Sequence, residues 1–189
     1  MDYYRIKHTI GMCLCSSGTK RAEYLKKHNI LAHVGKNCMV MFRKIPLYSK
    51  LISLGDNVWI ASQVDLIPHD VIHRMLNNSI SDGTFEEYIG CIEIKDNVFI
   101  GANSTVLPDV MIGSNTVIAA GSVVNKSIPG NGVWGGVPAK YICSLDDLIY
   151  KRRKETKIEV DKNRKCGLTD QTVEACWQRF RDKENRRNG

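Results

Sequence analysis

Residues 94–129 read IKDNVF IGANST VLPDVM IGSNTV IAAGSV VNKSIP, which is six consecutive units of six residues. An aliphatic residue opens every unit, and the fifth position always carries a small or β-branched side chain. The same register recurs upstream in VGKNCM, which begins at Val34, and in LGDNVW, IASQVD and LIPHDV, which begin at Leu54. Between Val40 and Leu54 the register slips by two residues, around residues 43–46.

A period of six predicts short strands that are joined by corners. It fits neither the 3.6-residue period of a helix nor the two-residue alternation of one long strand. An aliphatic side chain of each unit is expected to point inward, and Gly, Asn or Asp to occupy the corner, where a positive φ is often required. Three units then complete a triangular coil, so Ile94 stacks on Ile112 and Ile100 on Ile118. The expected fold is an all-β solenoid, a parallel β-helix of roughly four to five coils. The alternative, an ordinary β-sandwich, does not account for six units in phase.

The segments around the repeats divide the chain into three parts. Residues 1–33 are an N-terminal helical segment with a short polar helix at 19–29, residues 34–142 are the repeat domain, and residues 143–189 are a basic, helical C-terminal extension. Within the repeat domain, residues 67–91 contain no hexads, and they are expected to project from one corner as an insertion. Loops of this length are usually functional.

Two helices are expected in the C-terminal extension. Ser144-Leu145-Asp146-Asp147 resembles a capping box that opens a helix near 145–155. A second helix is expected from Thr169 to about Glu184. Its apolar residues recur at helical spacing, which predicts a packing face. The residues of this face are Val173, Cys176, Trp177 and Phe180.

The net charge of +7 comes from 27 basic and 20 acidic residues, and it is concentrated in the tail. Residues 1–149 carry 14 Lys and Arg against 13 Asp and Glu, whereas residues 150–189 carry 13 against 7. No nucleic-acid motif accompanies the basic tail, so nucleic acid is not expected as a partner. The seven scattered cysteines are typical of a reducing compartment. With no signal-peptide pattern and no long apolar run, we expect a cytoplasmic protein without membrane insertion.

The hexads, the histidine-containing insertion and the endings AGSVVNKSIP and GGVPAK resemble the hexapeptide-repeat acyltransferases over about residues 30–142. Within that family the chain resembles the maltose and galactoside O-acetyltransferases and the related capsular-polysaccharide acetyltransferases. The resemblance implies a left-handed coil, against the usual right-handed crossover. It also implies acetyl-CoA as co-substrate and a homotrimer whose active sites lie between subunits.

The resemblance implies that His69 is the general base of acetyl transfer. In the family a histidine at this place takes the proton of the acceptor hydroxyl while the oxygen attacks the thioester carbonyl. A neutral imidazole suits this task at pH 7. A plain surface histidine is the alternative. Asp70 and His73 are candidate acceptor contacts or orienting groups, and Asp70 also suits a turn. The oxyanion is expected to meet a backbone N–H near Gly101 and Ala102.

Family members lay the pantetheine arm of coenzyme A along the prism edge, beside small residues one coil apart. The positions that match the donor contacts of the family are Gly101, Ala102, Ala120, Asn125, Lys126, Gly136 and Lys140. Asn125 departs from the usual threonine at its position. Lys126 and Lys140 are expected to meet coenzyme A phosphates as point charges, although each would also suit a solvated corner.

Met41 stands where the family usually has an acceptor-binding asparagine, and Arg43 follows two residues later. A neutral galactoside or maltose is therefore doubtful as the acceptor. Arg43 would favour an acidic or phosphate-bearing sugar, unless it forms a structural ion pair.

The expected function is acetyl-CoA-dependent O-acetylation of a sugar or a polysaccharide precursor, by direct transfer in a ternary complex. The nearest alternative is N-acetylation of an amino-sugar. His69 and His73 also suit a zinc enzyme of the carbonic anhydrase class, but that site needs a third histidine. The other histidines, His8, His28 and His33, precede the first clear coil, so no metal is expected. A non-catalytic trimeric scaffold is the last alternative.

Overall fold

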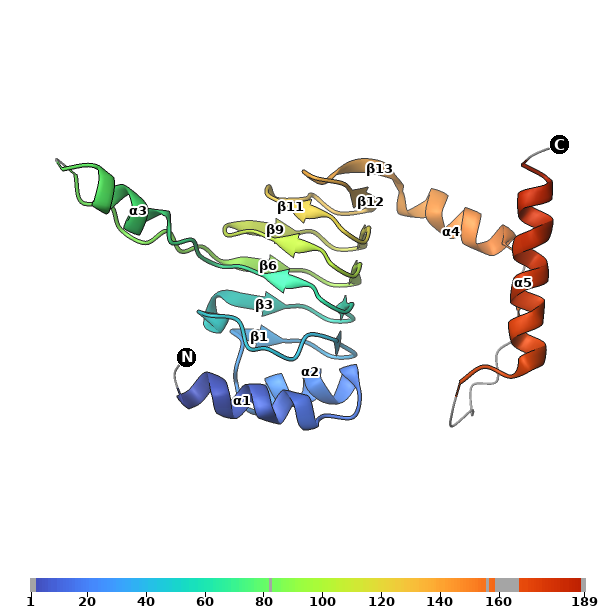
Figure 1. Cartoon of the computed structure of the whole chain (residues 1–189), viewed down its shortest axis with the longest axis horizontal. Coiled ribbons are helices and arrows are strands. Elements are labelled where there is room, and N and C mark those ends of the chain that lie inside the picture. Colours follow the sequence, from blue (N-terminus) through green and yellow to red (C-terminus); the bar gives the residue numbers. More distant parts are fainter. Residues whose placement is uncertain (1–2, 82, 156, 159–166, 188–189) are drawn as a thin grey trace. The chain divides into compact units, whose positions relative to one another are not determined.

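The hexads form short strands that stack into three sheets (Figure 1). This computed structural model describes residues 3–81, 83–155, 157–158 and 167–187. Sheet A contains β1 (His33–Val34), β3 (Ile52–Leu54), β6 (Ile92–Ile94) and β9 (Val110–Ile112). Sheet B contains β2 (Met39–Val40), β4 (Trp59–Ile60), β7 (Val98–Ile100), β10 (Thr116–Ile118), β12 (Gly132–Gly135) and β13 (Lys140–Ser144). Sheet C contains β5 (Asp65–Leu66), β8 (Thr105–Val106) and β11 (Val123–Val124).

The chain passes from sheet A to sheet B to sheet C and then begins the next coil. All pairs of neighbouring strands are parallel except β12 with β13. Ile94 is paired with Ile112, and Ile100 with Ile118. These pairings, 18 residues apart, confirm the triangular coils that the hexads predicted.

Two positions of each hexad are buried, not one as expected. The opening residues Ile100, Ile112 and Ile118 have no exposed surface, and neither do the fifth-position residues Ser104 and Thr116. A hydroxyl at the fifth position can be buried because it finds a backbone carbonyl. The Thr116 hydroxyl, for example, donates to the Gly113 carbonyl at 2.7 Å.

The fourth position of a hexad turns the corner with a positive φ, as the abundance of Asn and Gly predicted. Positive φ occurs at Asn37, Asn57, Gln63, Asn97, Asn103, Asp109, Asn115 and Gly121. Asparagine tolerates this conformation better than most residues. At one corner the asparagines also bond between coils, because Asn57 Nδ2 donates to Asn97 Oδ1 at 3.0 Å and Asn97 Nδ2 to Asn115 Oδ1 at 3.1 Å.

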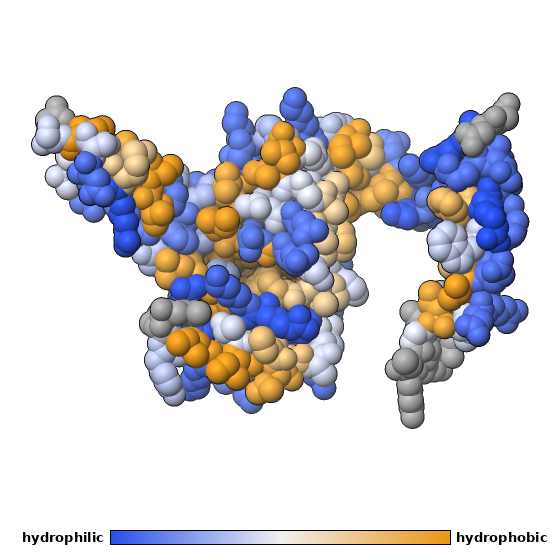
Figure 2. All heavy atoms as spheres, in the orientation of Figure 1, coloured by the Kyte–Doolittle hydropathy of each residue, from blue (hydrophilic) through white to orange (hydrophobic). Residues whose placement is uncertain are grey.

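Two helices, not one, precede the first coil. The expected helix is α2 (Gly18–Lys27), which packs against the coils through the fully buried Leu25. The additional helix is α1 (Tyr3–Leu14). Its buried residues are His8 and Met12, whereas Ile10 is 55% exposed. Apolar side chains of α1 therefore lie on the surface in Figure 2, so its apolar pattern did not mark the buried face.

The insertion at 67–91 projects from the stack as expected (Figure 1), but it contains an unexpected helix, α3 (Ile72–Ser79). The outgoing and returning segments of the insertion are hydrogen-bonded to each other at its base. His69 and Ile89 form an antiparallel bridge, and the Gly90 N–H donates to the Pro68 carbonyl at 2.9 Å.

The C-terminal helices are α4 (Leu145–Lys154) and α5 (Asp170–Asn185). The capping box of α4 is confirmed, since the Asp147 N–H donates to Ser144 Oγ at 3.0 Å and the Ser144 N–H to Asp147 Oδ2 at 3.3 Å. The predicted packing face of α5 includes Trp177 and Phe180, each of which is 55% exposed.

The chain divides into two compact units, residues 1–149 and 150–189. Residues 143 and 144 of the expected extension belong to β13, which pairs antiparallel with β12 and so continues sheet B. Residues 159–166 of that extension, Cys166 included, lie outside the described residues. No helix among the described residues is long and apolar enough to cross a membrane.

Candidate functional site

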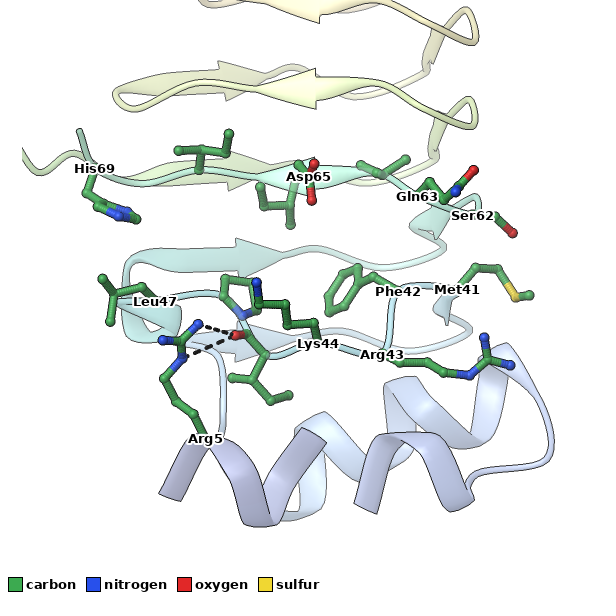
Figure 3. Close-up of a pocket in the computed structure, with 15 residues that line it drawn as sticks. Arg5, Met41, Phe42, Arg43, Lys44, Leu47, Ser62, Gln63, Asp65 and His69 are labelled. Carbon is green, nitrogen blue, oxygen red and sulfur yellow. Dashed lines mark hydrogen bonds between the residues drawn. The ribbon is translucent and has the colours of Figure 1, made fainter. Parts of the chain in front are cut away.

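A cleft of about 580 Å³ lies along sheet C, between segment 41–47 of the first coil and residues 62–69 of the second (Figure 3). It follows from the register slip at 43–46, because sheet C begins only with β5. Below β5 the irregular segment takes the place of a strand and leaves a hollow. Figure 3 places His69 at one end of this cleft and Met41 at the other.

The structure brings three of the predicted residues, His69, Met41 and Arg43, into the same cleft. It also adds Lys44 and Asp65 to the lining, which sequence reasoning missed. Both residues carried a signal. Lys44 lies in the slipped segment, and Asp65 occupies the exposed position of a strand whose next residue opens a hexad.

Segment 41–47 is held to the N-terminal helices through its backbone. Arg21 is only 2% exposed, and its Nε donates to the Val40 carbonyl at 2.8 Å. Further along, Arg5 Nη2 donates to the Ile45 carbonyl at 3.0 Å. Both bonds are charge-assisted, a class that is stronger than neutral hydrogen bonds. The floor of the cleft is therefore fixed at both ends.

His69 occupies the fourth position of LIPHDV, where the other coils turn a corner and where this coil departs into the insertion. Its ring meets the ring of Tyr48 edge to face, with centroids 5.3 Å apart and an interplanar angle of 88°. The Nδ1 atom of His69 is buried and has no hydrogen-bond partner among the described residues. Nε2 is therefore the ring nitrogen that can meet a ligand.

Tyr48 is held on both its backbone and its side chain. It has a φ of 52°, in the left-handed region that bulky residues rarely adopt. Its hydroxyl donates to Glu87 Oε2 at 2.9 Å, and this bond to a carboxylate raises the pKa of Tyr48. The tyrosine thus connects His69 with the returning segment of the insertion, to which Glu87 belongs.

Asp70 and His73 lie outside the lining of the cleft. Asp70 Oδ1 accepts from the Ile72 N–H at 3.0 Å, which is a turn at the start of α3. His73 belongs to α3, and its Nδ1 is buried without a partner among the described residues.

The positions matched to the donor divide between two corners of the triangle. Gly101, Ala102 and Ala120 lie where sheet B turns into sheet C, and the Gly121 N–H donates to the Ala102 carbonyl at 2.8 Å. A Cβ on Gly101 would stand 2.4 Å from the backbone nitrogen of Ala120, so only glycine permits this approach of two coils.

Asn125 and Lys126 follow β11 and lie at the opposite end of sheet C, at the corner where His69 also lies. The structure therefore does not bring His69 together with the small residues of the other corner within one chain.

The last two matched positions lie near the end of the stack. Gly136 has a φ of 99°, and its carbonyl accepts from the Val123 N–H at 3.0 Å, so its segment stacks on β11. Lys140 is exposed and begins β13. Within the part of the chain that the structure describes, no three His, Cys, Asp or Glu side chains gather as ligands for a metal ion.

Comparison with known proteins gives the same family by sequence and by structure. Residues 92–126 match the family described as bacterial transferase hexapeptide (six repeats). A galactoside O-acetyltransferase of Escherichia coli K12 is 38% identical over 117 residues, which are 61% of this chain and 55% of that protein. The chain thus spans little more than half the length of that relative.

Two solved structures cover more of the fold. A galactoside acetyltransferase in complex with coenzyme A is 30% identical, with a TM-score of 0.55, over 77% of this chain and 82% of that one. A maltose O-acetyltransferase of Clostridium difficile 630 is 28% identical, with a TM-score of 0.56, over 75% of this chain and 84% of that one. This chain therefore belongs to the bacterial hexapeptide-repeat transferase family.

Proposed function

We propose that this protein transfers the acetyl group of acetyl-CoA to a hydroxyl group of a sugar, with His69 as general base. The observation that carries the proposal is the position of His69, at the end of a cleft between its own coil and the first coil. The names of the relatives support the rest. Two act on galactosides and one on maltose, and one of them was solved with coenzyme A bound.

In the proposed reaction His69 Nε2 takes the hydroxyl proton as the acceptor oxygen attacks the thioester carbonyl. The tetrahedral intermediate then collapses, the C–S bond breaks, and the imidazolium returns the proton to the coenzyme A thiolate. The acetyl group passes directly from donor to acceptor in a ternary complex. A positioned base contributes about 10²–10⁴-fold to such a step.

The oxyanion needs an N–H group that is not already in use. The Gly101 N–H donates to the Ile118 carbonyl at 2.8 Å, so it is occupied. The Ala102 N–H has no partner among the described residues, which makes it the better donor of the expected pair. Ala102 and Ala120 then flank the pantetheine arm, and Lys126 and Lys140 bind phosphates of coenzyme A.

The separation of the two corners supports an assembly in which neighbouring copies share a site. His69 and Ala102 lie at opposite ends of sheet C in one chain. A second copy would place its B–C corner beside His69 of the first, and a closed ring of three would use every corner in this way. We propose this homotrimer, with left-handed coils as in the family.

The proposal is tested by offering acetyl-CoA with a panel of hydroxyl sugars and amino-sugars and following coenzyme A release. Mild alkali distinguishes the products, because it hydrolyses esters and leaves amides intact. Alkali-labile acetyl sugars are the expected result. Alkali-stable products would show N-acetylation instead, and a failure to bind coenzyme A would leave a non-catalytic scaffold.

A further inference from the structure

We propose that the acceptor carries an anionic group, a carboxylate or a phosphate, and that Lys44 binds this group in the cleft along sheet C, with Arg43 adding positive charge at the Met41 end of the cleft. This inference rests on the proposed function, since it names the class of sugar whose hydroxyl is presented to His69. It is carried by the charge of the cleft, by the outward direction of the two cations, and by the absence of an ion pair to either of them among the described residues.

The cleft is cationic although the unit that contains it is not. Arg43 and Lys44 line it, and Asp65 is the one carboxylate among the lining residues. Residues 1–149 as a whole balance 14 cations against 13 anions. The excess of positive charge in this cleft is therefore local. A cleft with one sign of charge concentrates ligands of the opposite sign.

Arg43 and Lys44 are adjacent in the sequence and lie between two buried residues. Phe42 and Ile45 are 9% and 0% exposed, so Arg43 and Lys44 between them must turn outward. The Ile45 N–H also donates to Thr9 Oγ1 at 3.3 Å. Because segment 41–47 is held to the N-terminal helices at both ends, its backbone loses little conformational freedom when a ligand binds.

Neither Arg43 nor Lys44 is neutralised by a carboxylate among the described residues. The ion pairs among the described residues do not include Arg43 or Lys44. This settles the alternative that the sequence left open at Arg43, because no structural ion pair forms there within the described part of the chain. The Lys44 ammonium group is therefore available to an anion in the cleft, and Figure 3 shows the Arg43 guanidinium directed toward the Met41 end.

The rest of the cleft suits the sugar that bears the anion. Figure 3 shows Asp65 reaching into the cleft from β5, opposite Lys44, with His69 at the end. A carboxylate such as Asp65 accepts hydrogen bonds from sugar hydroxyls. A sugar acid or sugar phosphate can therefore place its anion at Lys44, its hydroxyls at Asp65 and the reacting hydroxyl at His69.

The test measures binding and turnover with matched sugars. The probes are D-glucose, D-glucuronate and D-glucose 6-phosphate, together with the corresponding galactose series. The variants are Lys44→Gln and the double variant Arg43→Gln, Lys44→Gln. Lys36→Gln is the control, because Lys36 is an exposed lysine of the same coil that does not line the cleft. Binding is measured by NMR saturation transfer and calorimetry without acetyl-CoA, and turnover by coenzyme A release.

We expect the wild type to bind the anionic sugars at least about tenfold more tightly than the neutral ones, because hydrogen bonds to charged groups are worth more than neutral ones. The double variant should lose this preference and Lys36→Gln should keep it. Raising the NaCl concentration to about 0.5 M should weaken anion binding by screening. The ratio between glucuronate and glucose 6-phosphate distinguishes a carboxylate from a phosphate acceptor.

Equal binding of neutral and anionic sugars to the wild type would overturn the inference, and so would an unchanged preference in the double variant. A rise only in the KM for acetyl-CoA would also overturn it, since the cations would then serve the donor. Acetylation of neutral sugars alone would leave the proposed function standing without this inference. Cleft-dependent anion binding without any acetyl transfer would support the anion site and reject the proposed function.

Discussion

Replacing Gly101 by alanine tests whether the backbone at Gly101 lies as close to the backbone of Ala120 in the next coil as the structure shows. The added Cβ would stand 2.4 Å from the nitrogen and 2.7 Å from the Cα of Ala120. Ordinary contacts between such atoms are roughly 3.5–4.0 Å, so the neighbouring coil must move by about 1 Å. Overpacking of this kind costs about 1–3 kcal/mol. We expect the upper end, about 3 kcal/mol, because backbone atoms cannot rotate away as a side chain can.

Gly121→Ala is the matched control at the same corner. Its φ is +71°, and a Cβ there would have nothing within 4 Å, so only backbone strain applies. That strain costs about 1 kcal/mol. Urea unfolding at one fixed protein concentration gives both values. Coenzyme A affinity should fall in Gly101→Ala, because Ala120 belongs to the proposed donor corner. If Gly101→Ala were as stable as the wild type, or lost less than Gly121→Ala, the close contact would be refuted.

Two further predictions concern the N-terminal helices and the partner of the proposed base. Burial, with smaller effects of His28 and Lys7, lowers the pKa of His8, so the unfolded chain binds a proton more readily than the folded one. The contribution of His8 to the free energy of unfolding should be fully present above pH about 6.5 and be lost as the pH falls below it. The urea midpoint should therefore fall less with decreasing pH in His8→Phe than in the wild type. An equal dependence of the midpoint on pH in both proteins would count against this role of His8. Tyr48→Leu should lower kcat about tenfold at an unchanged KM for acetyl-CoA. Tyr48→Phe should lower kcat less, because the phenyl ring still packs on His69. Equal kcat values for both variants and the wild type would argue against a role of Tyr48 in positioning His69.

The coils could be predicted from the sequence because the hexad is a local signal repeated many times. Ile94 and Ile112 pair as expected, and the two-residue slip at 43–46 correctly marked an irregular segment. Helix α1 was not predicted, since most of its apolar side chains, Ile6, Ile10 and Leu14 among them, lie outside its buried face. Helix α3 was not predicted either, because all of its residues are at least partly exposed.

The sequence predicted several residues of the candidate site, but not how these residues are arranged in space. The resemblance pointed to His69, but the cleft itself arises from a segment without periodicity, so neither Lys44 nor Asp65 was expected in it. The spacing of the donor positions in the sequence did indicate that they divide between two corners of the coil. Ala120 and Lys126 are one hexad apart and therefore lie at neighbouring corners, whereas Ala102 and Ala120 are one coil apart and share a corner.

The transfer chemistry proposed for His69 is tested most directly by coenzyme A release from acetyl-CoA in the presence of a working acceptor, compared between wild type and His69→Ala. His69 is partly exposed at the end of the cleft, and its Nδ1 bonds to none of the described residues, so its removal should leave the fold and coenzyme A binding intact. We expect the turnover of His69→Ala to fall by at least about 100-fold. Undiminished turnover in a folded His69→Ala protein would contradict the role of His69 as the base.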